Sequence, residues 1–133
     1  MRVFEIHEGA RNSKGRAIQN MLNIEPDDKI TAFIRVESFN DADYNNSHNI
    51  IFCTKKGIVK KTSLADYSRP RAKGIIAINI REDDSVIDVA MTNGHSQIIL
   101  ADRQGRAIRF PEEKVRVMGR GATGVKGMEI IGD

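Results

Sequence analysis

The fold is decided by IIFCTKKGIVKK, residues 50–61, in which two apolar segments flank a Lys-Lys-Gly turn. Gly57 can supply the positive φ that a tight hairpin turn requires. Two further β-type segments follow, GIIAINI at 74–80 and SVIDVAM at 85–91. We therefore predict a hairpin of strands 50–54 and 58–62, a short helical turn over 63–67, and strands over 75–80 and 86–91.

The same pattern returns on both sides of this stretch. IILADRQG at 98–105 matches residues 50–57, and GVKGMEI at 124–130 matches residues 74–80. Upstream, a segment matches residues 79–90 when Ile24 is set on Ile80, which predicts a strand over 29–36, and residues 3–6 form another β-type segment. A repeat of nearly fifty residues built from short strands is typical of propeller arrays. The predicted fold is all-β, with propeller-like or β-pinwheel blades of four-stranded antiparallel sheets.

The repeats divide the chain into three parts. Residues 1–48 are predicted to form a partial first blade plus a linker loop over 37–48, residues 49–94 a central blade, and residues 95–133 a partial following blade. A closed propeller needs about four or more blades, so we expect a single fragment of a larger ring, with roughly two to three blades present. Open sheet edges invite pairing, which predicts that the fragment self-associates.

Composition narrows the function classes. The chain has 133 residues, 40% hydrophobic content and a net charge of +3. Cys53 is the only cysteine, which excludes an internal disulfide; we expect it to be a small buried apolar residue. No apolar run reaches the roughly 18 residues of a membrane helix. We expect a cytoplasmic chain without a membrane partner.

The candidates for catalysis are weak. The three histidines lie far apart without metal-ligand spacing. The paired acids Asp27-Asp28 and Asp83-Asp84 occupy the same place in two repeats, which indicates a repeated turn. The glycine-rich loop 119–124 lacks the Gly-Lys-Ser/Thr of a phosphate loop. We predict no catalytic, cofactor-binding or metal-binding residues.

Basic residues give a stronger signal. They recur at equivalent points of the repeats, Lys55 with Arg103 and Lys61 with Arg109. A rim of such charges can follow a phosphate backbone, and the lack of a recognition helix favours sequence-tolerant binding of bent duplex DNA along one continuous outer arc. A protein-interaction propeller without a DNA role is the alternative. The predicted DNA-binding residues are Arg11, Lys14, Arg16, Lys55, Lys56, Lys60, Lys61, Arg69, Arg71, Lys73, Arg103, Arg106, Arg109, Arg120 and Lys126.

Several motifs together resemble a known family. VFEIHEGAR at 3–11, KGRAIQNML at 14–22, TKKGIVKKT at 54–62, GIIAIN at 74–79, and RVMGR with TGVKG between 116 and 127 are similar to the C-terminal domain of the bacterial DNA gyrase A subunit. The resemblance implies a six-bladed β-pinwheel whose blades exchange strands. It also implies that duplex DNA wraps on the basic outer rim and that this wrapping supports ATP-dependent negative supercoiling.

Two features of that family are missing from the chain. Its box QRRGGKG is absent and would lie upstream of Met1. The resemblance places the cleaving tyrosine, ATP and Mg²⁺ in other domains, and it implies that the gyrase B subunit is reached through the rest of the gyrase A protein. We therefore expect this fragment to bind no cofactor and neither to cut nor to supercoil DNA by itself, in a nucleoid-associated parent enzyme. Without the box, the equivalent C-terminal domain of topoisomerase IV remains an alternative.

Overall fold

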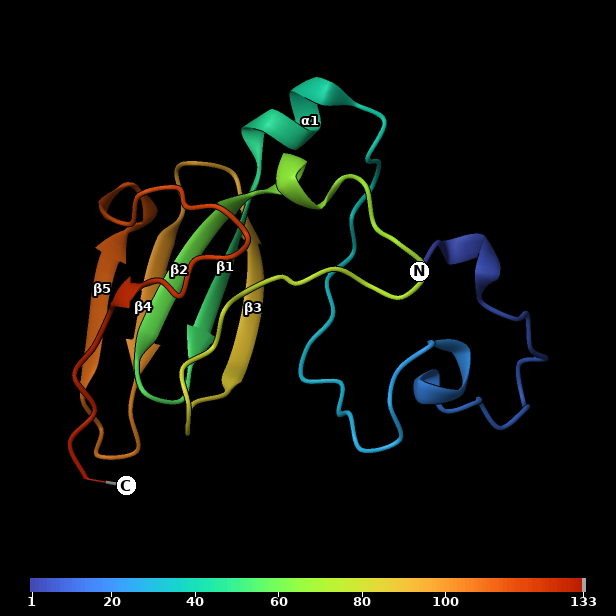
Figure 1. The fold of residues 1–133 in the computed structure, drawn as a ribbon, viewed down its shortest axis with the longest axis horizontal. Helices are drawn as coiled ribbons and strands as arrows, with labels where there is room; N and C mark the ends of the chain where they lie inside the picture. The colour runs from blue at the N-terminus through green and yellow to red at the C-terminus, as the bar shows by residue number, and fades with distance from the viewer. Residues whose placement is uncertain (133) are drawn as a thin grey trace.

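The computed structural model describes residues 1–132 and contains two antiparallel sheets side by side (Figure 1). One sheet has four strands in the order β3-β1-β2-β6, and the other consists of β4 and β5. The last residue of the predicted part 95–133 lies outside the described residues. The strands are β1 Asn49–Thr54, β2 Ile58–Ser63, β3 Val86–Thr92, β4 Gln97–Ala101, β5 Ala107–Pro111 and β6 Val125–Lys126.

The β1–β2 hairpin forms as predicted. Its register runs from Asn49 opposite Ser63 to Cys53 opposite Val59. Gly57 adopts a φ of 80°, and its N–H donates to the Thr54 carbonyl at 3.0 Å. The β4–β5 hairpin repeats this geometry at Gly105, also with a φ of 80°. The two hairpins are therefore structural as well as sequence repeats.

The fourth strand of the larger sheet comes from the next repeat. β3 pairs with the outer edge of β1, and β6 pairs with the other edge of the hairpin, with Ile58 opposite Lys126 and Val59 opposite Val125. β6 belongs to the predicted following blade, so the central sheet is completed by strand exchange. The prediction of four-stranded antiparallel sheets is confirmed for this sheet.

Short helices fill the connections. They are α1 Ala42–Ser47, η1 Val3–Glu5, η2 Ile18–Met21, η3 Leu64–Tyr67 and η4 Glu112–Lys114, where η marks a 3₁₀ helix. The predicted helical turn after β2 is confirmed as η3. The loop predicted over 37–48 is wrong in part, because Asp41 caps α1 by accepting the Tyr44 N–H at 3.0 Å.

The core lies on both faces of β1 and β2. Ile50 and Phe52 pack with Leu64 on one face, and Ile51 packs with Val59 and Val115 on the other. Successive side chains of a strand point to opposite faces, so a strand covered on both sides buries every residue in turn. The first five residues of β2 are all buried, and its two lysines are among them.

Several predicted strands do not form. Residues 3–6 contain a 3₁₀ helix, and residues 29–36 and 75–80 form no strand. A strand requires a neighbour with a free hydrogen-bonding edge, and these segments pair with none among residues 1–132. Residues 34, 36, 77 and 78 instead pack their side chains against the Ile50–Phe52–Leu64 cluster. Residues 115–118 form no strand and make one isolated bridge, between Val117 and Lys61.

Candidate nucleic-acid interface

The first group of predicted bases lies in the hairpin turns. Lys55 and Lys56 are exposed in the β1–β2 turn, and Arg103 is exposed in the β4–β5 turn. Both turns lie at the same end of the two sheets, at the bottom of Figure 1. Lys55 and Arg103, which are equivalent in the sequence repeat, therefore also occupy equivalent turns in the structure. We call these three residues the hairpin-turn group.

A second group lies in the loop that follows η3. Arg69, Arg71 and Lys73 are all exposed there. The loop is closed at its base, because the Tyr67 hydroxyl donates to the Ala77 carbonyl at 2.9 Å. In Figure 1 this loop extends away from the sheets toward the N-terminus. It therefore presents its positive charges at a distance from the hairpin turns.

Lys60 connects this loop to a third basic segment. Its ammonium donates to the Ala77 carbonyl at 2.7 Å and to the Arg120 carbonyl at 2.5 Å. The same ammonium lies 5.5 Å from the centre of the Phe52 ring. The Asn79 N–H also donates to the Ala122 carbonyl at 3.2 Å. One buried ammonium thus holds together the two segments that carry Arg69–Lys73 and the half-buried Arg120. We call residues 69–73 and 119–121 the basic loop pair.

The environment of Lys60 changes its ionisation. Burial lowers the pKa of Lys60 to about 8; the nearby Asp66 carboxylate acts in the opposite direction, and the Arg120 guanidinium adds to the lowering. The ammonium keeps most of its charge at neutral pH, and its two hydrogen bonds to carbonyls offset part of the cost of burial.

Lys60 and Lys61 are corrections to the predicted DNA-binding set. Lys60 is 0% exposed and Lys61 is 6% exposed, so neither can reach a phosphate in this structure. The reason is the position of β2, which is covered on both faces. Lys61 and Arg109 occupy equivalent places in the two hairpins, as the sequence match predicts. Their environments differ, because Lys61 is buried and Arg109 is exposed on β5.

Lys61 belongs to a buried polar network. Its ammonium donates to the Glu112 carbonyl at 2.8 Å and lies 3.8 Å from the Glu112 carboxylate. That carboxylate also accepts the Thr92 hydroxyl at 2.7 Å and the Ser96 N–H at 2.9 Å. Burial alone would raise the pKa of Glu112, but these hydrogen bonds and the Lys61 charge outweigh it and lower the pKa. The network ties β2 and β3 to the start of the second hairpin.

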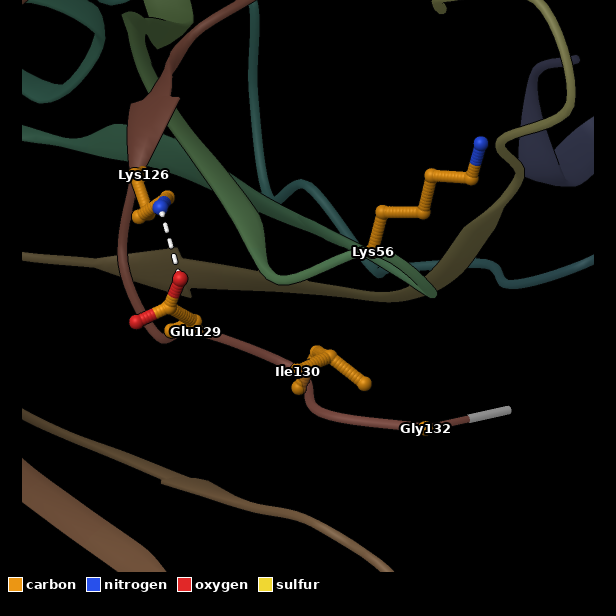
Figure 2. Close-up of a pocket in the computed structure, with 5 residues that line it drawn as sticks. All are labelled: Lys56, Lys126, Glu129, Ile130 and Gly132. Atoms are coloured by element: carbon orange, nitrogen blue, oxygen red, sulfur yellow. Dashed lines mark hydrogen bonds and ion pairs between the residues drawn. The ribbon is translucent and has the colours of Figure 1, made fainter.

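Two other predicted bases are engaged by neighbouring groups. Arg106 donates to the Asp102 carboxylate at 2.7 Å and to the Glu129 carbonyl at 2.9 Å. Lys126 lies 3.5 Å from the Glu129 carboxylate, as Figure 2 shows, while the Lys56 side chain points away from that pair. A phosphate would have to compete with these partners, so both residues are weaker candidates than the hairpin-turn group.

The remaining predicted bases, Arg11, Lys14 and Arg16, are exposed in the N-terminal segment. The exposed bases thus form a hairpin-turn group, a basic loop pair and an N-terminal group, in addition to Arg109. The expectation of one continuous outer arc for the whole predicted set is wrong for this structure, because Lys60 and Lys61 are interior and the groups occupy separate places.

Within residues 1–132, no group of three or more His, Cys, Asp or Glu side chains could hold a metal ion. No helix in the described part of the chain is long and apolar enough to cross a membrane. Cys53 is half-buried, and burial, with Asp88 and Asp84 nearby, raises the pKa of its thiol.

The chain consists of repeated hairpins of short antiparallel strands, one of which is completed by a strand from the next repeat. Their turns and loops are basic, so together they define a propeller-type module with a basic surface. The family described as DNA gyrase C-terminal domain, beta-propeller, matches residues 2–37, 48–93 and 98–130. The chain therefore belongs to this gyrase C-terminal domain family, and the predicted β-pinwheel fold class is confirmed.

Relatives agree with this assignment. The DNA gyrase A subunit of Salmonella typhimurium is 41% identical over 133 residues, all of this chain and 15% of that protein. The corresponding protein of Buchnera aphidicola subsp. Baizongia pistaciae is 44% identical over 130 residues, 98% of this chain and 15% of that protein. The chain thus spans about 15% of the length of these curated relatives.

Solved structures show the same fold. A crystal structure of the C-terminal domain of DNA topoisomerase IV matches with a TM-score of 0.76 and 35% identity over 88% of this chain and 35% of that one. A structure of the DNA gyrase A C-terminal domain matches with a TM-score of 0.72 over 88% of this chain and 37% of that one. At 20% identity, this second likeness supports the fold alone.

Proposed function

We propose that this chain binds duplex DNA without strong sequence preference and acts as a DNA-wrapping part of the gyrase A protein, in support of ATP-dependent negative supercoiling. Membership of the gyrase C-terminal domain family supports the proposal. The observation that carries it is the exposure of Arg69, Arg71 and Lys73 on one loop, whose base at Ala77 the buried Lys60 ammonium ties to the Arg120 carbonyl.

The chemistry of these groups suits a phosphate backbone. Lysine and arginine side chains on exposed loops can neutralise phosphates and release counterions, and this term does not depend on base sequence. Direct base reading in the major groove typically uses a helix. The one α-helix among residues 1–132, α1, has only six residues and two acids at its start, Asp41 and Asp43. The contacts are therefore proposed to be with the backbone.

The remaining partners are proposed from the family. The gyrase B subunit would be reached through the rest of the gyrase A protein, with ATP and Mg²⁺ bound by other domains. The whole enzyme would work on the chromosome in the bacterial cytoplasm. DNA cleavage is likewise proposed to occur outside this chain.

Charge reversal tests the proposed contacts. The variant R69E/R71E/K73E should bind a duplex of about 40 base pairs at least about tenfold more weakly and lower the slope of log affinity against log salt by about 3. The control R81E/K114E/R116E changes the same number of exposed charges outside the predicted set. Equal losses in the two variants would show that only net charge matters, and a flat salt dependence in the wild type would favour a protein-interaction module.

The topoisomerase IV domain is kept as a second candidate because a structure of that domain is 35% identical to this chain. The two candidates differ in how far bound DNA is wrapped. Saturating a nicked plasmid with the chain, sealing the nick and measuring linking number tests this. A large shift of constant sign supports the gyrase candidate, whereas binding with little shift favours the topoisomerase IV candidate.

A further inference from the structure

The 3₁₀ helices η3 and η4 follow the two hairpins at equivalent places in the repeat. Leu64 begins η3, and Glu112 begins η4. The Leu64 N–H donates to the His48 carbonyl at 3.0 Å, and the Glu112 N–H donates to the Ser96 carbonyl at 2.9 Å. The spacing that relates the two hairpins also relates Leu64 to Glu112 and His48 to Ser96. The backbone therefore makes the same contact at both places.

The side chains at these two places are opposite in kind. Leu64 and Glu112 are both 0% exposed. Leu64 packs with the apolar Ile50 and Phe52, whereas the Glu112 carboxylate lies 3.8 Å from the Lys61 ammonium. An apolar side chain thus fills this place in one repeat, and a buried ion pair fills it in the next. The turn itself does not require an acid.

Stability alone does not account for the acid. Taking a carboxylate and an ammonium out of water has a large cost in free energy, which their attraction offsets only in good geometry. Apolar side chains of similar volume often replace a buried ion pair without loss of stability. What Glu112 adds, and Leu64 cannot, is a set of directional hydrogen bonds.

These hydrogen bonds come from both sheets. The Glu112 carboxylate accepts the Thr92 hydroxyl at the end of β3 and the Ser96 N–H just before β4. Its main-chain carbonyl accepts the Lys61 ammonium from β2. Glu112 also follows directly the last residue of β5. One residue therefore connects the four-stranded sheet to both ends of the second hairpin.

The apolar contact between the two sheets is less directional. Neither β4 nor β5 pairs with a strand of the larger sheet in the part of the chain that the structure describes. The hairpin instead packs Ile98, Leu100 and Phe110 near Ile51 and Val59. Because apolar burial has no preferred direction, these contacts hold the sheets together but restrain the angle between them less than hydrogen bonds do.

Glu112 lies at the end of the second hairpin that is opposite its turn. Both hairpin turns lie at the other end of the sheets, at the bottom of Figure 1. There the second hairpin makes exposed contacts, such as that from Arg106 to the Glu129 carbonyl. A strand of five residues spans roughly 17 Å, so a rotation of about 10° at the Glu112 end would move Arg103 by about 3 Å.

We propose that Glu112 is a positioning residue, which together with Lys61 fixes the angle between the two sheets and thereby the spacing of the hairpin-turn group. Its effect on the angle does not depend on DNA. Its effect on DNA binding rests on the proposed function, in which a long duplex touches the hairpin-turn group. The carboxylate is 0% exposed, so it acts on DNA only through the placement of these bases.

Removing both charges together tests this role. Lys61→Met/Glu112→Leu introduces the side chain that Leu64 has at the equivalent place, and it leaves no charge buried alone. Lys114→Met/Glu113→Leu is the matched control, because it makes the same substitutions at exposed residues of η4. Urea unfolding measures stability. Amide residual dipolar couplings, fitted separately for β1–β3 and for β4–β5, measure the orientation of the two sheets.

In the wild type and the control, one alignment tensor should fit the couplings of both sheets. The variant Lys61→Met/Glu112→Leu should be at least as stable as the wild type. Its β4 and β5 couplings should be reduced and should no longer fit the tensor of β1–β3, because the hairpin moves against the sheet. A single tensor in this variant would overturn the proposal. A marked loss of its stability would also overturn it, since the network would then serve folding and not orientation.

Duplex DNA gives a second measurement. Lys61→Met/Glu112→Leu should bind a duplex of about 40 base pairs about threefold more weakly than the control, but one of about 12 base pairs with unchanged affinity and salt slope. A residue in contact with a phosphate would lower that slope. Equal affinities of variant and control for the longer duplex would overturn the effect on DNA binding. A wild type that binds neither duplex would refute the proposed function, while the dipolar couplings would still decide the role of Glu112.

Discussion

At the residue scale, Lys60 and Lys61 are buried lysines that support the basic surface from the interior. Each ammonium is buried and directed at backbone carbonyls, Lys60 toward Ala77 and Arg120, Lys61 toward Glu112. A charged donor satisfies several acceptors at once, and its hydrogen bonds are stronger than those of a neutral group. These two residues therefore position loops and elements that carry the exposed bases.

The pKa of Lys60 has a consequence for stability. Since the folded pKa is about 8 and the usual value is 10.5, the unfolded chain holds more protons between these pH values, and the free energy of unfolding should rise with pH there. Lys60→Met should abolish this rise of the unfolding free energy with pH, which is at most about 3 kcal/mol. Urea unfolding across the window measures it, with Lys55→Met as the exposed control; parallel profiles for wild type and Lys60→Met would contradict it.

Glu112 has a linkage of the same sign in a lower pH range, because its folded pKa is lowered as well. Its pKa is lowered in the folded chain, so its stabilisation is present above the ordinary value of 4.5 and is lost as the pH falls through the folded value. Glu112→Gln should lower the free energy of unfolding by about 3 kcal/mol at pH 7, because Lys61 is left buried without its partner. The difference from wild type, measured by urea unfolding, should shrink in acid. The neighbour Glu113→Gln, an exposed acid, should show neither effect.

At the element scale, the two-residue strand β6 depends on close backbone approach. Gly124→Ala should detach it from β2, because the added Cβ would lie 2.5 Å from the Val59 carbonyl oxygen. Amide exchange at Gly127 and Met128 should then accelerate, while the β1–β3 pairing stays protected. Gly121→Ala is the control, with open space around its Cβ. Unchanged protection at Gly127 in the Gly124 variant would refute this account of β6.

The elements also show what can be predicted from sequence. Both hairpins follow from local patterns, namely apolar segments on either side of a turn glycine such as Gly57. The partner of β2 cannot be identified locally, because β6 lies more than sixty residues along the chain. The burial of Lys60 and Lys61 depends on that partner and on η4, so the sequence alone presents them as surface charges. The cap at Asp41 is a local signal for α1 that the prediction missed.

At the scale of the whole molecule, the exposed bases are divided between separate places. The hairpin-turn group lies at one end of the sheets, while the loop of Arg69, Arg71 and Lys73 extends from another side (Figure 1). A duplex that touches both groups must be long or bent, and bending costs on the order of 1–10 kcal/mol. Affinity should therefore depend on DNA length.

Length dependence can be measured with one variant. K55E/K56E/R103E should weaken binding to a duplex of about 40 base pairs but have little effect on one of about 12, which the basic loop pair can bind alone. Fluorescence anisotropy at fixed salt gives both affinities, and R69E/R71E/K73E should weaken both. Equal losses on the two lengths for the hairpin-turn variant would mean that the groups bind DNA independently of its length.

The strand that β2 receives from beyond the second hairpin has a consequence for how such chains can evolve. The repeat in the sequence and the folded sheet are out of phase, because the four-stranded sheet is completed by β6, which belongs to the following repeat. Deleting one repeat at its sequence borders would remove the final strand of the preceding sheet. A change in the number of repeats therefore has to preserve the strand exchange between neighbours.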